Sequence, residues 1–151
     1  MRTETSFPQN KVGAPAGLFI PSTSSTELLK IIGLISQQNP LQKKRIHKFL
    51  QGQNKEYWDF AENLSSILNH SFLTDDESRC QAAAAYNKMC MDFLKEQIRF
   101  RKTGVYRIDD ASVAVVQVYG DMNVMRYYMV GLLISYLFWP NHYELFRFFK
   151  D

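Results

Sequence analysis

The amino-acid sequence predicts an all-α fold, an irregular bundle of about six or seven helices with an extended N-terminal leader. Apolar side chains recur every three or four residues along most of the chain, which is the period of an amphipathic helix. Capping residues and prolines separate these segments, and no two of them alternate as paired strands would. Because 151 residues is a typical length for one domain, we expect residues 24–151 to form a single helical domain.

Residues 1–23 are expected to form an extended or disordered leader. They contain Pro8, Pro15 and Pro21 and run into a segment rich in serine and threonine, a composition typical of irregular chain. The same segment lacks the apolar centre of a secretory signal peptide. We therefore expect a cytoplasmic protein.

Three helices are predicted over residues 24–38, 40–51 and 54–69. The first begins with the spacing of a capping box, and Asn39 and Asn54 stand where the caps of the second and third belong. The side chains predicted to face the core from these helices are Leu28, Ile31, Ile32, Ile35, Leu41, Ile46, Phe49, Leu50, Tyr57, Phe60, Ala61, Leu64, Ile67 and Leu68.

A long fourth helix is predicted over about residues 75–102. Thr74 and Glu77 have capping-box spacing at its start, and a basic turn followed by Gly104 marks its end. The small side chains of 82–85 should let another helix approach closely. Its buried face is predicted to continue through Tyr86, Met89, Cys90, Phe93 and Leu94.

Residues 111–119 are ambiguous between helix and strand. Four valines favour a strand by side-chain type, whereas Asp109 or Asp110 in front of them suits a helix cap. A lone strand would leave its backbone groups without hydrogen-bond partners. We therefore predict a short helix here.

The densest apolar and aromatic content lies in residues 122–149, with nine aromatic side chains between Tyr127 and Phe149. The uncharged run from Tyr127 to Trp139 is shorter than the roughly 18–20 residues that a membrane span requires, so no membrane association is expected. Asp121 should cap a buried helix here, and Asn141 should cap the last one. We expect this stretch to form the centre of the core and also a junction, because it is apolar enough to serve two domains.

No complete catalytic or metal site can be read from the sequence. His47, His70 and His142 lie in separate elements, and Cys80 and Cys90 lie about 15 Å apart along one helix. A zinc site, a disulfide between these cysteines and a phosphate-binding glycine loop are therefore not predicted. We assign no catalytic residue.

Eight of the 18 lysine and arginine residues form two clusters, which we interpret as solvated helix faces, so no nucleic acid partner is expected. The members are Lys43, Lys44, Arg45 and Lys48 in one group and Arg99, Arg101, Lys102 and Arg107 in the other. The pentapeptide Trp139-Pro140-Asn141-His142-Tyr143 has two interpretations. It is either a tight corner between two helices or a polar and aromatic cluster beside a ligand.

The run MRYYMVGLLISYLFWPNHYELFRFF resembles the segment just before the catalytic domain in some bacterial class I S-adenosylmethionine-dependent methyltransferases. The resemblance covers residues 105–151, and residues 1–100 match only as a generic helical lid. In that family the helical region leads into a Rossmann-like domain that begins with a strand and an acidic, glycine-rich loop. Neither feature follows Lys150 in this sequence.

The resemblance implies that residues 1–151 are the N-terminal part of a longer methyltransferase, a lid that covers the substrate site or forms dimer contacts. S-adenosylmethionine would then be held by the C-terminal Rossmann-like catalytic domain, with a small-molecule substrate, and would not bind this chain alone. Tyr127, Tyr128, His142 and Tyr143 are placed near the cofactor or substrate. The alternative is a self-contained helical module that binds another protein.

Overall fold

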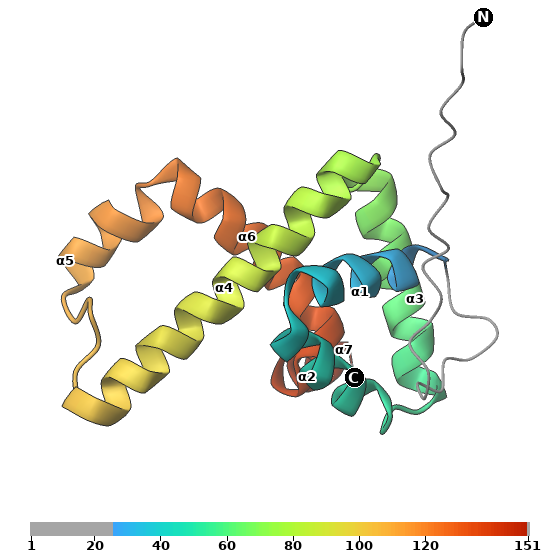
Figure 1. Cartoon of the computed structure of the whole chain (residues 1–151), viewed down its shortest axis with the longest axis horizontal. Coiled ribbons are helices and arrows are strands. Elements are labelled where there is room, and N and C mark those ends of the chain that lie inside the picture. Colours follow the sequence, from blue (N-terminus) through green and yellow to red (C-terminus); the bar gives the residue numbers. More distant parts are fainter. Residues whose placement is uncertain (1–25, 151) are drawn as a thin grey trace, which may run out of the picture.

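The computed structural model describes residues 26–150, and every regular element within them is helical. Seven α-helices follow one another along this part of the chain, with one π-helical turn, η1, between the fifth and sixth (Figure 1). The predicted all-α bundle is therefore confirmed. The bounds are Thr26–Gln38 (α1), Pro40–Leu50 (α2), Lys55–Ser71 (α3), Asp76–Thr103 (α4), Ala111–Ala114 (α5), Val115–Tyr119 (η1), Met122–Phe138 (α6) and Pro140–Lys150 (α7).

Two sequence predictions fall outside the described residues. These are the leader over residues 1–23 and the start of the first helix at Ser24. Within residues 26–150, no helix is long and apolar enough to cross a membrane.

The predicted aliphatic stripe of α1 is confirmed, because Leu28, Ile31, Ile32 and Ile35 are all buried. Asn39 accepts hydrogen bonds from the first amides of α2, with Pro40 in the first helical position, also as predicted. The prediction for Leu41 is wrong. The core stripe of α2 repeats every four residues through Gln42, Ile46 and Leu50, and Leu41 lies about 100° away from it. Its side chain is 43% exposed.

Helix α3 begins as predicted at Asn54, whose side chain accepts a hydrogen bond from the Tyr57 amide. Tyr57 and Ala61 are fully buried, and Leu68 continues their face. Ile67 was also predicted to face the core, but it lies one position off this stripe and is 52% exposed. The aromatic ring of Tyr57 thus stands at the centre of the core.

Helix α4 has the predicted long span, but its capping box is shifted by one residue. Asp75, in place of Thr74, is the cap: its carboxylate accepts from the Ser78 amide at 2.7 Å, and the Ser78 hydroxyl accepts from the Asp75 amide at 3.2 Å. A carboxylate suits this position because it also faces the positive end of the helix dipole. At the other end Gly104 adopts the left-handed conformation, with φ of 72°, as expected of a terminal glycine.

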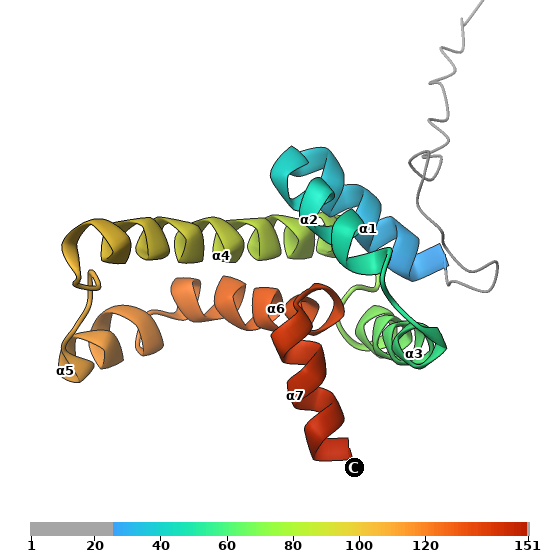
Figure 2. The same cartoon turned by 90° about the horizontal axis from the view of Figure 1, so that it is seen from below.

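Helices α4 and α6 lie side by side and make the most extensive helix contact within residues 26–150 (Figure 2). Their close packing depends on small side chains. A Cβ atom added to Gly131 of α6 would lie 3.0 Å from the Cβ of Met89 and 3.3 Å from the Ala85 carbonyl oxygen. The predicted close approach at the alanine run is therefore confirmed. Tyr86, Met89 and Cys90 are buried as predicted.

Beyond this crossing the C-terminal half of α4 leaves the body of the molecule (Figure 1). Phe93 is 40% exposed and Leu94 is only partly buried, so the prediction of a continuous buried face through both residues is wrong at Phe93. The physical reason is that α4 extends past the helices that cover its first half.

Residues 111–119 form helix, as predicted, in α5 and η1. The Asp110 carboxylate accepts the Ser112 amide at 2.7 Å, which explains why the helix starts there. Together with the far ends of α4 and α6, these residues form an arm that projects from the body (Figure 1). Val115, Val116 and Tyr119 on this arm are 58%, 72% and 64% exposed.

The prediction that 122–149 forms the centre of the core is only partly correct. Ile134, Leu137 and Phe138 in the second half of α6 are buried, but Met122 and Phe149 at the two ends are 79% and 77% exposed. The predicted cap at Asn141 is wrong. The Trp139 carbonyl accepts the His142 and Tyr143 amides, and α7 begins at Pro140. Proline suits the first helical position because it donates no amide hydrogen there.

Candidate functional site

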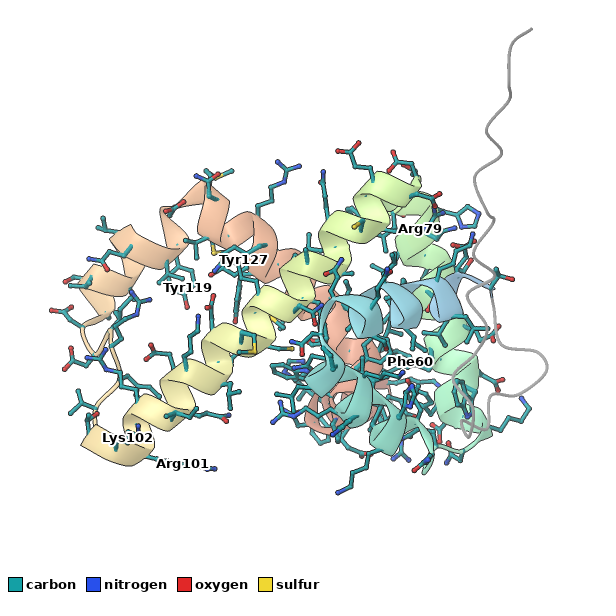
Figure 3. The ribbon with its side chains drawn as sticks, viewed as in Figure 1. Phe60, Arg79, Arg101, Lys102, Tyr119 and Tyr127 are labelled. Carbon is teal, nitrogen blue, oxygen red and sulfur yellow. The ribbon has the colours of Figure 1, made fainter. Side chains whose placement is uncertain are left out.

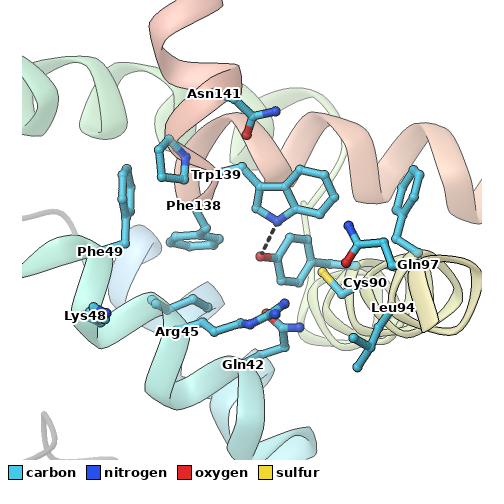
Figure 4. A pocket seen from close by; sticks show the side chains of 14 residues that line it. Gln42, Arg45, Lys48, Phe49, Cys90, Leu94, Gln97, Phe138, Trp139 and Asn141 are labelled. Atoms are coloured by element: carbon cyan, nitrogen blue, oxygen red, sulfur yellow. Dashed lines mark hydrogen bonds between the residues drawn. The ribbon is translucent and has the colours of Figure 1, made fainter. Parts of the chain in front are cut away.

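A pocket of about 550 Å³ lies where α2, α4 and the corner between α6 and α7 meet (Figure 4). This volume lies within the range of about 300–1,000 Å³ that is typical of small-molecule sites. Its lining comes from three parts of the chain that are distant in sequence. The lining residues are Gln42, Arg45, Ile46, Lys48, Phe49, Tyr86, Cys90, Phe93, Leu94, Gln97, Phe138, Trp139, Pro140 and Asn141.

One wall of the pocket is a fixed aromatic cluster. The Trp139 indole N–H donates to the Tyr86 hydroxyl at 3.1 Å, and the Trp139 ring meets Phe93 edge-on with centroids 5.7 Å apart. Tyr86 in turn meets the Phe138 ring edge-on at 5.9 Å. Because Trp139 is fixed by a hydrogen bond and by ring packing, its face is a preformed flat surface for a ligand.

The opposite side of the pocket is positively charged. Arg45 extends from α2 toward the centre of the pocket, on the side of Cys90 (Figure 4). Lys48 lies on the same helix, and the lining contains no aspartate or glutamate. No carboxylate in the described part of the chain forms an ion pair with Arg45 or Lys48. The pocket therefore offers unpaired positive charge beside an aromatic wall.

The Cys90 thiol and the Tyr86 hydroxyl, which both line the pocket, are held in their neutral forms. Burial raises the pKa of the Cys90 thiol, although Tyr86, Trp139 and Arg45 oppose that effect. Burial likewise raises the pKa of the Tyr86 hydroxyl. A protonated thiol is a poor nucleophile, so Cys90 is suited to packing rather than to covalent chemistry.

The predicted site residues do not meet at one place. The Tyr127 hydroxyl donates to Asp92 at 3.1 Å, and the Lys88 ammonium lies 4.2 Å from the centroid of the Tyr127 ring. Burial alone would raise the pKa of Asp92, but hydrogen bonding and charge attraction from Lys88 lower it overall. Tyr119 and Tyr127 are both directed toward α4 (Figure 3). Tyr127 thus joins α6 to α4 away from the pocket.

Tyr128 and His142 lie against the aromatic wall rather than in the pocket lining. The Tyr128 ring lies 6.3 Å from Phe93, and the His142 ring lies 4.9 Å from Trp139, measured between centroids. His142 Nδ1 is 2.6 Å from the Ser135 hydroxyl, which itself donates to the Leu132 carbonyl. A hydroxyl has one hydrogen, so we infer that His142 Nδ1–H is the donor to Ser135 and that Nε2 is the free acceptor.

Tyr143 is a core residue in this structure. It is 6% exposed, and its ring lies 5.2 Å from the rings of both Tyr57 and Phe60. The proposed role of Tyr127, Tyr128, His142 and Tyr143 beside a cofactor or substrate stays a prediction.

Sequence analysis did not bring the pocket residues together as one site, although it named the pentapeptide at 139–143 as a possible cluster beside a ligand. Arg45 was assigned to a solvated face together with its lysine neighbours, and all four side chains are exposed as predicted, but Arg45 and Lys48 also line the pocket. The helical spacing of these residues could have indicated the pocket. Gln42, Arg45 and Phe49 lie on one face of α2. On α4, residues 86, 90, 93 and 97, which carry aromatic, thiol and amide side chains, also share one face. For the pentapeptide at 139–143, the structure shows a helix corner. Its first three residues line the pocket, whereas His142 and Tyr143 do not.

The stability of the chain should fall as the pH is lowered from about 7.5 to 5.5, the range in which histidines titrate. Burial lowers the pKa values of His142 and His47 below the ordinary 6.5, and the Lys43 charge adds to the effect on His47. The unfolded chain then binds protons more readily than the folded chain. The stabilisation is therefore complete above pH 6.5 and is lost as the pH falls toward the folded pKa values.

Urea denaturation across this range measures the effect. The matched control is the His47→Gln/His142→Asn chain, in which the amide of asparagine retains a donor for Ser135. Its unfolding free energy should change less with pH than that of the parent chain. Equal slopes for the two proteins would contradict the prediction.

In chemical terms the pocket combines aromatic, amide and cationic side chains. It presents flat apolar walls, amide groups and unpaired positive charge, with a neutral thiol in its lining. Among residues 26–150, no three histidine, cysteine, aspartate or glutamate side chains gather as a metal site would require. No family model, curated protein or solved structure matches this chain.

Proposed function

We propose that this chain is the helical lid or accessory region of a class I S-adenosylmethionine-dependent methyltransferase. In this proposal a separate Rossmann-like domain holds the cofactor, and the helical region covers the substrate site. The resemblance of residues 105–151 to the segment before such catalytic domains supports the proposal. The helical architecture of residues 26–150 fits an accessory role, because a Rossmann-like cofactor site requires a parallel sheet.

The observation that carries the proposal is the uncovered apolar end of α7. The helix projects from the body (Figure 2), and Phe148 and Phe149 near its outer end are 75% and 77% exposed. Leu145 is 46% exposed on the same helix. Large apolar side chains that are contiguous and exposed mark surfaces where another domain or protein binds. Covering them is favourable by about 25 cal/mol for each Å² of apolar surface buried.

The remaining parts of the proposal follow from this arrangement. A second domain that packed along the whole of α7, from its outer end back to Pro140, would reach the corner at Trp139, and the aromatic wall and His142 would then lie near the junction of the two domains. A homodimer through the arm is compatible with the same chain. A cytoplasmic location belongs to the proposal as well, because Cys80 and Cys90 are both free thiols, which reducing compartments preserve.

The proposal predicts that residues 1–151 alone do not bind S-adenosylmethionine, because the cofactor site belongs to the other domain. Calorimetric titration of the purified chain with S-adenosylmethionine should show no binding heat at millimolar ligand. A dissociation constant near or below about 100 μM, which corresponds to roughly 5.5 kcal/mol of binding free energy, would contradict the assigned architecture.

The second candidate is a self-contained module that binds another protein through the projecting arm. Its specific support is the exposure of Val115, Val116 and Tyr119 on one helical segment. The two candidates use different surfaces. Under the methyltransferase proposal, Phe149→Asp should disturb domain packing and Val116→Asp should not; under the module proposal, Val116→Asp should abolish partner binding.

A further inference from the structure

The pocket between α2, α4 and the α6–α7 corner has a lining that selects a particular chemistry. Its apolar surfaces are flat: the Trp139 indole, held by Tyr86, stands beside Phe93 and Phe138. Aromatic faces of this kind favour a planar ring system, in offset or edge-to-face contact. A cavity of about 150 Å³ can bind benzene. The 550 Å³ here leaves room for a larger molecule of two or three rings.

The charges of the lining determine what group such a ligand carries. Arg45 and Lys48 contribute two positive charges, and no acidic side chain opposes them in the lining. The whole of α2, from Pro40 to Leu50, contains no aspartate or glutamate. The guanidinium of Arg45 offers a planar fork of donors that matches a carboxylate, and such charge-assisted hydrogen bonds are about twice as strong as neutral ones.

The polar neutral groups in the lining complete the pattern. Gln42 is 3% exposed, and Gln97 and Asn141 lie at other points of the lining. These amides can donate to the oxygens of an anion or to a ring hydroxyl. No side chain of the lining is an acceptor with negative charge, so a cationic ligand is disfavoured.

We propose that this pocket binds a planar aromatic monocarboxylate of two or three rings, with its rings against Trp139 and Phe93 and its carboxylate on Arg45. The proposal goes beyond the accessory function and does not depend on it, because every lining residue belongs to this chain. A second copy of the chain or a peptide in the same groove are the competing occupants.

The test uses 2-naphthoate as the probe and 2-naphthylmethanol as its neutral match in shape. Binding to residues 1–151 is measured by calorimetry and by the NMR signals of the two indole N–H groups. Trp139 lines the pocket, whereas Trp58 is buried in the core and does not line it. Naphthoate should bind with a dissociation constant below about 1 mM and shift the Trp139 indole signal alone.

Three variants make the assignment specific. Arg45→Gln should weaken naphthoate binding by about tenfold or more, the loss expected of a charged hydrogen bond, and should leave naphthylmethanol binding unchanged. Arg101→Gln is the matched control, because Arg101 lies exposed at the far end of α4 (Figure 3), and it should change neither. Leu94→Trp should fill the pocket and abolish binding of both probes, with an unchanged circular dichroism spectrum as proof of folding.

The proposal is overturned if naphthoate at millimolar concentration leaves the Trp139 indole signal unshifted. It is also overturned if Arg45→Gln weakens the binding of naphthoate and the binding of naphthylmethanol equally. Shifts confined to the amides of α7 would show adsorption to Phe148 and Phe149 and would also overturn it. If the Trp139 indole signal shifts with protein concentration in the absence of any probe, the occupant of the pocket is a second copy of the chain and the proposal is overturned.

Discussion

Replacing Tyr57 by alanine should lower the free energy of unfolding by about 3–5 kcal/mol, the loss typical of deleting a large buried aromatic side chain. Tyr57 is fully buried, and its ring meets the rings of Phe49, Trp58 and Tyr143 edge-on at 5.2–5.4 Å. These neighbours belong to α2, α3 and α7, so the substitution removes the contact that joins them. Urea denaturation measures the loss.

The hydroxyl of Tyr57 has a separate contribution. It donates to the Leu137 carbonyl at 2.6 Å, and this carbonyl lies in the last turn of α6, where no helical amide is available to it. Tyr57→Phe keeps the ring and leaves this buried acceptor unpaired, which should cost about 1–3 kcal/mol. As a surface control, Tyr106→Ala should cost less than either, because Tyr106 is 53% exposed. A Tyr57→Ala loss no larger than that of the control would refute this account of the core.

Replacing Gly131 by leucine should destabilise the chain by about 1–3 kcal/mol or more through overpacking. Helix propensity alone would favour the change by nearly 1 kcal/mol, because glycine is a poor residue in a helix interior. Steric overlap with α4 opposes the substitution, and this effect is larger than the gain in helix propensity. A Cβ atom here would lie 3.0 Å from both Cβ and Sδ of Met89, and the sulfur can move whereas the Cβ cannot without moving α4.

Gly52→Leu is the matched control, because a Cβ atom at Gly52 would have no neighbour closer than the Phe49 carbonyl at 4.0 Å. The control should change stability by no more than about 0.5 kcal/mol, as is usual for an exposed site. Thermal melting of the two variants compares them directly. If Gly131→Leu is as stable as the parent chain, then α4 and α6 do not pack as closely as described.

The helices themselves could be predicted because their signals are local. The stripe from Leu28 to Ile35 and the caps at Asn39 and Asn54 depend only on nearby residues, and all of them are present in the structure. The errors at Leu41 and Ile67 are errors of one position. The sequence of a helix does not show whether an apolar side chain next to the core stripe faces inward or outward. Only packing against other helices decides between the two.

The surfaces and the pocket could not be predicted in this way. The content of 122–149 suggested one core element, yet Met122 and Phe149 are exposed, because apolar composition does not distinguish burial within this chain from burial against another. The pocket requires α2, α4 and the α6–α7 corner to meet. Arg45 has no special sequence context, and its position across the pocket from Trp139 arises only from tertiary packing.

The coding sequence that follows the codon for Asp151 tests the central claim most directly. The claim is that these helices form the lid of a class I methyltransferase. It predicts an open reading frame that continues from α7 into a β-strand and an acidic, glycine-rich loop, the features that bind the cofactor in a Rossmann-like domain. A stop codon immediately after Asp151, read in the transcript of the gene, would contradict it.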